Sequence, residues 1–208
     1  MRTATSAISK PLLPRMAWIN TRLLRRLVDL APHAGSDCAL LASMAAQRTQ
    51  LQALNRFSLR HVAEIGHLLV NLRFADLPWW EARCRDAERP AHEQSFPETM
   101  AERDIVDLAC SSVLLACSAA RTDADCAVIL LGVSRPLVGL LATLPIDVAL
   151  LVAAYQAHEL SVRWAQQHYF WDNLLSAAQR GDRHALDDVY VHGLLILGGE
   201  TLAPARRS

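Results

Sequence analysis

The stretch from Asp125 to Ala154 constrains the fold more than any other part of this chain. It is strongly apolar, yet Asp125, Arg135 and Asp147 divide it. The pieces are shorter than the ~20 consecutive apolar residues that a membrane-spanning helix needs. We therefore expect short buried helices here and no membrane span, because helices that are apolar nearly all round belong in a protein core.

Helix-start signals stand at these divisions. Ser134 precedes an Arg-Pro pair, and Thr143 precedes Leu144-Pro145. A Ser or Thr can cap the free amides of a first turn, where proline loses no hydrogen bond. Asp147 would lie in the next first turn, where a carboxylate suits the positive end of a helix. The stretch thus predicts three short consecutive helices.

The composition allows a large core but no dominant charge. Of the 208 residues, 52% are hydrophobic, and the formal net charge is zero. This length fits one large domain or two small ones. No basic excess points to nucleic acid. Lys10 is the only lysine, and the other cations are arginines. Arginine suits planar recognition of phosphate or carboxylate, although a GC-rich genome gives the same bias.

Cysteine usage and the first residues point to the cytoplasm. The cysteine count is odd and no C-x-x-C occurs, which favours reduced, buried thiols. The five are Cys38, Cys84, Cys110, Cys117 and Cys126. Residues 1–17 hold no apolar core of a signal peptide ahead of Pro11, so we expect a disordered N-terminus and a cytoplasmic protein.

The rest of the chain reads as helices with one central break. Apolar residues at helical spacing predict further helices at 18–31, 37–54, 58–74, 104–120, 168–179 and 186–197. Ser58 would cap the third of these, and Gly181 and Gly198-Gly199 would end the last two. The polar segment 85–103, with Pro90 and Pro97, is the predicted linker. No strand pattern is found, so the predicted class is all-α.

The two sides of this linker resemble each other, with a spacing of about ninety residues. The similar pairs are SDCALLA (36–42) and ADCAVIL (124–130), FSLRHVAEI (57–65) and ATLPIDVAL (142–150), and LVNLRF (69–74) and ELSVRW (159–164). Bulky aromatics then follow in both, Trp79-Trp80 and residues 169–171. The common order predicts an internal duplication.

Six segments of the second copy follow the order of a known family. They are DIVDL (104–108), VLLA (113–116), LGVSRPLVGLLATLP (131–145), SVRW (161–164), FWDNLLSAAQRGD (170–182) and HGLLILGGE (192–200). In that order they resemble the flagellar transcriptional activator FlhD family of proteobacteria. The first copy resembles it more faintly, through INTRLLRRL (19–27), AAQRTQLQAL (45–54), FSLRHV (57–62) and LRFAD (72–76).

The resemblance implies two FlhD-like domains, 18–84 and 104–203, packed as an intramolecular pseudo-dimer. It also implies a non-enzymatic regulator that joins an FlhC-like partner and activates flagellar genes on promoter DNA. Some features depart from the family. Its Phe-Arg-Phe element reads Val162-Arg163-Trp164, the cysteine before that element is absent, and the first copy lacks the Leu-Gly turn and the Leu-Pro helix start.

Residues for catalysis or for metal and cofactor binding are not predicted. The eight histidines lack the i, i+4 pairing with an intervening glutamate that a helical zinc site needs. They are His33, His61, His67, His92, His158, His168, His184 and His192. No phosphate-binding or nucleophile-elbow motif occurs, so neither a cofactor nor a small-molecule substrate is expected.

The predicted DNA-contacting residues are arginines, because cationic contacts to phosphates fix a protein's register on DNA. They are Arg22, Arg25, Arg26, Arg56, Arg60 and Arg163. The sequence equally allows a solvated face on which these arginines pair with carboxylates. Since the net charge is zero, contact within a complex with a basic partner is favoured over contact by this chain alone.

Tryptophans are the candidate interface residues, because tryptophan is enriched in binding hot spots. They are Trp79, Trp80, Trp164 and Trp171. Packing in the core is the alternative for each. Two functions follow. One is an FlhD-like transcriptional regulator with an FlhC-like partner. The other is a helical accessory protein of a secretion or motility system that makes no DNA contact.

Overall fold

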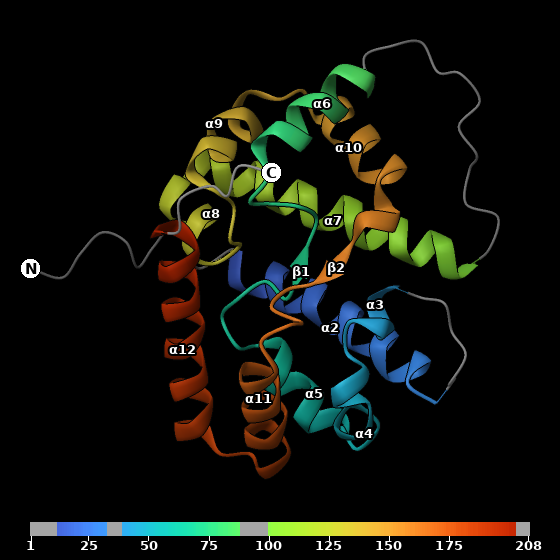
Figure 1. Ribbon diagram of the computed structural model, residues 1–208, viewed down its shortest axis with the longest axis vertical. Coiled ribbons are helices and arrows are strands. Elements are labelled where there is room, and N and C mark those ends of the chain that lie inside the picture. The colour runs from blue at the N-terminus through green and yellow to red at the C-terminus, as the bar shows by residue number, and fades with distance from the viewer. Residues whose placement is uncertain (1–11, 33–38, 88–99, 203–208) are drawn as a thin grey trace, which may run out of the picture. The chain divides into compact units, whose positions relative to one another are not determined.

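A computed structural model describes residues 12–32, 39–87 and 100–202 (Figure 1). These residues are mostly helical, which confirms the all-α class. The predicted disorder of 1–17 is wrong for its last residues, because the first helix, α2, spans Leu12–Leu30. The segment 88–99, the middle of the predicted linker, lies outside the described residues.

The chain divides into two compact units that are discontinuous in sequence. Unit 1 combines residues 1–15 with 70–161, and unit 2 combines 16–69 with 162–208. The predicted copies, 18–84 and 104–203, follow one another along the chain. Copies and units are therefore different divisions, and each unit contains segments of both copies.

Unit 1 is built around a long apolar helix, α7, against which α8, α9 and α10 pack. Its helices are α6 (Leu77–Ala87), α7 (Met100–Thr122), α8 (Ala124–Ile129), α9 (Arg135–Thr143), α10 (Ile146–Tyr155) and the 3-10 turn η2 (Ala157–Glu159). Near the end of α7, the Arg121 guanidinium donates to the carbonyls of Ala142 and Leu144, at 3.1 and 2.6 Å. These two hydrogen bonds hold the junction between α9 and α10 against α7.

One helix of unit 1, Glu102–Thr122, is long and apolar enough to cross a membrane by length and composition. Half of its apolar window is buried within the protein, as in the core helix of a soluble domain. The helices α9 and α10 together would also be long enough, but they meet at a bend of 119°. The apolar composition of α7 is thus explained by the core that it forms.

The three predicted short helices are confirmed as α8, α9 and α10. Ser134 is the N-cap residue of α9, although its side chain makes no capping bond. Thr143 was wrongly expected to cap α10, whose N-cap is Pro145. The Thr143 hydroxyl instead donates back to the Leu140 carbonyl at 3.1 Å, as the last residue of α9. Asp147 does lie in the first turn of α10.

Unit 2 packs helices from both ends of the chain. They are α2 from Met16 onward, α3 (Ala39–Ala42), the 3-10 turn η1 (Ala45–Gln47), α4 (Arg48–Gln52), α5 (Arg56–Ala63), α11 (His168–Arg180) and α12 (Arg183–Leu202). Asn20, fully buried on α2, donates to the carbonyls of Ala63 and His67 and accepts from the Leu69 amide. One amide thereby satisfies the backbone where α5 ends.

Three predicted helices of unit 2 need correction. The predicted helix 58–74 begins at Arg56, with Asn55 rather than Ser58 as its cap, and ends at Ala63. The predicted helix 37–54 is broken into α3, η1 and α4. The last helix runs through Gly198-Gly199 to Leu202. Glycine costs a helix only about 1 kcal/mol, so neighbouring leucines can carry the helix across it.

A strand–turn–helix motif occurs twice, with residue n of the first copy matching residue n + 91 of the second. Strand β1 spans Val70–Asn71, and β2 spans Ser161–Val162; together they form a two-stranded sheet. After each strand one residue has a positive φ, 49° at Arg73 and 57° at Trp164. Those two are the only such non-glycine residues in the described ranges.

The hydrogen bonds of the two motifs also match at n + 91. The Trp80 indole N–H donates to the Leu72 carbonyl at 3.2 Å, and the Trp171 indole N–H donates to the Arg163 carbonyl at 3.1 Å. Both indoles are fully buried. The turns are closed by equivalent backbone bonds as well, Asp76 N to Arg73 O at 2.9 Å and Gln167 N to Trp164 O at 2.8 Å.

The helix that follows each strand packs against helices from the other side of the predicted linker. After β1, α6 packs against α9 and α10 within unit 1. After β2, α11 packs against α4, α5 and η1 within unit 2. Along the chain, α5 and α10 hold equivalent places, since each is the last α-helix before its strand, with η2 between α10 and β2 (Figure 1). The packing of both helices thus joins segments from the two sides of the predicted linker.

Candidate nucleic-acid interface

Three of the predicted arginines line one surface cavity of unit 2. Its volume is about 630 Å³, and its lining residues are Thr21, Arg25, Arg56, Phe57, Leu59 and Arg60. Thr21 and Arg25 are one turn apart on α2, so they share a helix face. The Asn55 side chain accepts from the Phe57 and Ser58 amides, at 2.9 Å each, and so starts α5 at this edge.

The cavity is cationic. Arg25 and Arg56 are exposed, and the Arg60 Nε donates to the Glu64 carboxylate at 2.8 Å. This bond raises the pKa of Arg60 from its already high value, which keeps its guanidinium charged. An exposed i, i+4 ion pair is weak. Glu64 can therefore yield to a stronger anion at Arg60.

Exposed aromatic rings accompany these arginines. Phe57 is 75% exposed in the first turn of α5, and Trp18 is 54% exposed on α2. The Arg22 guanidinium lies over the Trp18 ring, with 5.1 Å between its carbon and the ring centroid. Sequence reasoning missed both rings as surface residues. Trp18 stands off the buried stripe of α2, which was the available signal.

The other predicted DNA contacts stand differently. Arg26 is half-buried on α2. Arg163 is only 7% exposed, its Nη1 is 3.4 Å from the Leu68 carbonyl, and its guanidinium carbon lies 4.3 Å from the Trp164 ring centroid. A phosphate contact needs an exposed guanidinium, so Arg163 in this position supports the unit 2 core.

The predicted interface tryptophans mostly lie inside the units. Trp80 and Trp171 are fully buried, and Trp164 is 8% exposed. Trp79 is half-buried, in edge contact with Trp80 at 5.6 Å between centroids and 5.8 Å from the Arg73 guanidinium. For Trp80, Trp164 and Trp171 the structure corrects the interface prediction, because a buried ring has no surface to offer a partner.

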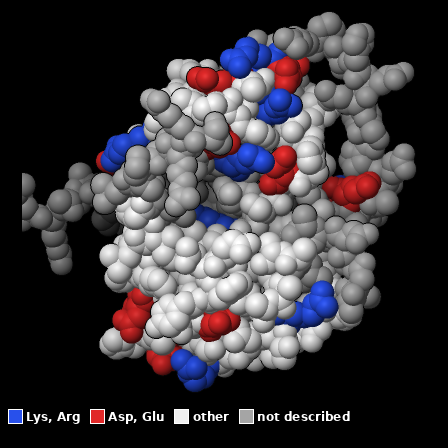
Figure 2. All heavy atoms as spheres, viewed as in Figure 1, with Lys and Arg blue, Asp and Glu red and all other residues white. Residues whose placement is uncertain are grey.

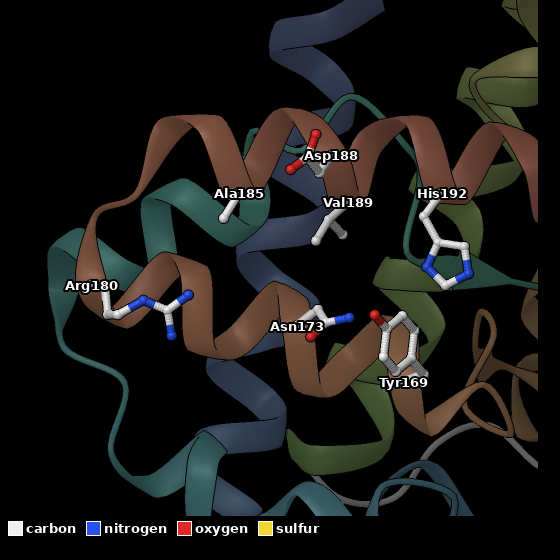
Figure 3. Close-up of a pocket in the computed structure, with 7 residues that line it drawn as sticks. All are labelled: Tyr169, Asn173, Arg180, Ala185, Asp188, Val189 and His192. Atoms are coloured by element: carbon white, nitrogen blue, oxygen red, sulfur yellow. The ribbon is translucent and has the colours of Figure 1, made fainter.

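A second hollow lies between α11 and α12 of unit 2 (Figure 3). Its volume is about 300 Å³, and its lining residues are Tyr169, Asn173, Arg180, Ala185, Asp188, Val189 and His192. Tyr169 and His192 lie together at one end, with 5.5 Å between ring centroids, and Arg180 lies at the other. The lining offers no serine or cysteine nucleophile.

The described cysteines form no disulfide with one another. Cys84, Cys117 and Cys126 are buried, as predicted, and Cys110 is half-buried, whereas Cys38 lies outside the described residues. Burial raises the pKa of Cys117 to about 11, which keeps it protonated. Burial, with Asp107 nearby, also raises the pKa of Cys110. Neither is an activated thiolate. Within the described ranges, no group of three or more His, Cys, Asp or Glu gathers as a metal site.

Charge on the face drawn in Figure 2 is mixed, with cationic and anionic side chains interspersed among uncharged ones. The arginine cavity is therefore a local feature rather than part of a broadly basic protein. In comparisons with known proteins, no family model, no curated protein and no solved structure matches this chain.

Proposed function

We propose that this chain is an FlhD-like transcriptional regulator made of two fused copies, which acts in the cytoplasm with an FlhC-like partner on promoter DNA of motility or related genes. The observation that carries the proposal is the strand–turn–helix motif repeated at n + 91. In each copy a turn residue has a positive φ, and an indole N–H donates to the carbonyl eight residues before it. Two unrelated halves would have no reason to share both features at one constant offset.

The reciprocal packing of α6 and α11 supports the pseudo-dimer part of this proposal. In a homodimer that exchanges C-terminal helices, each subunit completes the helix packing of the other. Here one chain would supply both subunits: α6 of the first copy packs against α9 and α10 of the second, and α11 of the second packs against α4 and α5 of the first. A fusion of this kind replaces a dimer with a single polypeptide.

Contact with DNA is supported by the cavity of Arg25, Arg56 and Arg60. Guanidinium forks bind phosphate oxygens in pairs, which is why arginine is used for this recognition. Three guanidinium groups neutralise few phosphates, so affinity by this chain alone is modest. The partner supplies the remaining contacts.

The DNA-binding test is fluorescence anisotropy on promoter duplexes, with and without the FlhC-like partner, at several salt concentrations. We expect the double variant Arg25→Ala/Arg56→Ala to weaken binding and to reduce the salt slope. Arg135→Ala, an exposed arginine of unit 1 paired with Asp125, is the matched control. Equal binding by the double variant and the control would overturn the assignment of this surface.

The fusion is tested by inserting a protease site within residues 91–96 of the full chain. After cleavage we expect the two pieces to co-elute under native conditions, because each unit holds segments from both sides of the cut. Light scattering on the uncut chain should give one chain per particle. An obligate dimer of the uncut chain, or separation after cleavage, would count against the pseudo-dimer.

The second candidate is a helical accessory protein without DNA contact. Exposed apolar side chains of unit 2 favour it: Tyr169 on α11 and Val191 and Leu195 on α12 are 72%, 52% and 69% exposed. Val191 and Leu195 are one turn apart and so share a face of α12, as apolar residues of a protein-binding face do. Binding of the partner with no effect of either on promoter duplexes would favour this candidate.

A further inference from the structure

Two aromatic rings, one lining the arginine cavity and one on the neighbouring face of α2, are exposed although burial in the fold would be favourable for them. Phe57 leaves three quarters of its side chain in water beside Arg56 and Arg60. Trp18 precedes Arg22 and Arg25 by four and seven residues, which places all three on one face of α2. Exposed rings of this size are unfavourable in water, so a ligand that covers them gains binding energy from both.

The composition of this surface selects the class of ligand. Arginines recognise phosphate oxygens, and exposed aromatic rings stack on flat ring systems. Unpaired nucleotides carry both groups at a short, regular spacing. A DNA duplex offers only the phosphates, because its base faces are hidden in the stack. An acidic peptide would satisfy the arginines but would leave the rings uncovered.

We propose that Trp18, Arg22, Arg25, Arg56, Phe57 and Arg60 form a binding surface for unpaired nucleotides of a single nucleic-acid strand. Phe57 and Trp18 stack on bases, while Arg25 and Arg56 contact the phosphates between them. Arg60 joins them when its exposed pair with Glu64 opens. This inference rests on the proposed function for its choice of nucleic acid, and it names the strand form that the surface prefers.

All six residues of this surface belong to unit 2. Binding is measured with the full chain. Anisotropy would compare a labelled 15-nucleotide dT strand, the matching rU strand and a mixed-sequence duplex. We expect the single strands to bind more tightly than the duplex, and the two sugars distinguish DNA from RNA as the source. Tighter binding of the duplex would overturn the proposal.

The stacking rings are tested by Phe57→Ala, with Tyr169→Ala as the matched control. Both side chains are similarly exposed, at 75% and 72%, so neither change should disturb the core. Loss of a base–aromatic stack should weaken single-strand binding on the order of tenfold, with duplex binding unchanged. Single-strand affinity that is equal in Phe57→Ala and Tyr169→Ala would overturn the stacking role.

The arginines are tested by salt dependence. Removal of one phosphate contact in Arg56→Ala should lower the slope of log affinity against log salt by about 0.7 for a single strand. Poly-glutamate at matched charge should compete weakly, and equal competition would mean that an acidic protein segment is the ligand instead. Promoter binding with the FlhC-like partner is a separate measurement, so failure here leaves the proposed function standing.

Discussion

Equivalent turns in the two units share a backbone conformation, but the side chain is charged and exposed in one and aromatic and buried in the other. Arg73 in unit 1 and Trp164 in unit 2 both follow a strand and have a positive φ. The Arg73 side chain is 45% exposed and donates to the Glu159 carboxylate at 3.0 Å. Trp164 is 8% exposed, in edge contact with Phe170 at 4.8 Å and with His67 at 5.3 Å between centroids.

Helix α12 explains the difference. Gly193 lets this helix approach so closely that a Cβ at that position would lie 2.6 Å from the His67 Nε2 and 3.2 Å from the Trp164 ring. The n + 91 counterpart of buried His67 is His158, whose side chain is 70% exposed. Backbone geometry is thus common to both turns, whereas the side chain depends on whether a helix covers it.

The largest effect should come from the two buried indoles that make the motifs equivalent. Trp80→Ala and Trp171→Ala should each lower the free energy of unfolding by about 3–5 kcal/mol, through the lost packing of a large ring. Denaturant unfolding followed by circular dichroism would measure both. Trp→Phe at each position should cost less, since it removes the N–H donor but keeps most of the volume. A large loss at only one position would break the equivalence.

The two turn residues should respond in opposite directions to glycine. Arg73→Gly relieves a positive φ and removes exposed ion pairs and the contact with the half-buried Trp79 ring, so we expect a change between zero and a gain of about 1 kcal/mol. Trp164→Gly relieves the same strain but empties a buried site, for a net loss of about 2–4 kcal/mol. Thermal unfolding of the two variants side by side gives the comparison. Similar losses would mean that Arg73 packs as Trp164 does.

The approach of α12 is tested with alanine at two of its glycines. Gly193→Ala forces a Cβ against His67 and Trp164 and should cost about 1–3 kcal/mol. Gly198→Ala meets nothing within 4 Å and should stabilise the helix by up to about 1 kcal/mol. Urea midpoints of both variants would show the opposite signs. A neutral Gly193→Ala would mean that α12 does not pack this closely on His67.

Sequence patterns were sufficient where local chemistry decides the outcome. The three helices of the apolar stretch follow from charge spacing and proline, and the end of α11 follows from Gly181, which has a φ of 66°. The limits of helices were missed where tertiary contacts decide. The chain leaves its helix at Ala63 because buried Asn20 bonds the carbonyls of Ala63 and His67.

The candidate site was predictable in part for the same reason. Arg25, Arg56 and Arg60 are recognisable as cations on helix surfaces, and the structure brings them to one cavity. No local pattern could show that Arg163 is covered, because its guanidinium bonds the carbonyl of Leu68, 95 residues earlier in the chain. Burial of Trp80 and Trp171 likewise depends on the packing of α6 and α11 against helices that are distant in the chain.

The smallest effect distinguishes two helix caps, Asn55 before α5 in unit 2 and Asp123 before α8 in unit 1. The Asp123 carboxylate accepts from the Cys126 amide at 3.0 Å, which lowers the pKa of Asp123. Alanine at either cap should cost about 1 kcal/mol near neutral pH. Measurement of the free energy of unfolding against pH separates them.

A lowered pKa means that the Asp123 contribution is complete above the pKa of the unfolded chain, about 3.9, and is lost as the pH falls through the folded value. The cost of Asp123→Ala should therefore shrink in acid. Asn55 carries no titrating group, so the cost of Asn55→Ala should stay constant over the same range. If the costs of both substitutions fell together in acid, the fall would reflect general acid destabilisation of the protein rather than protonation of Asp123. The ionised Asp123 carboxylate would then not be what holds the start of α8.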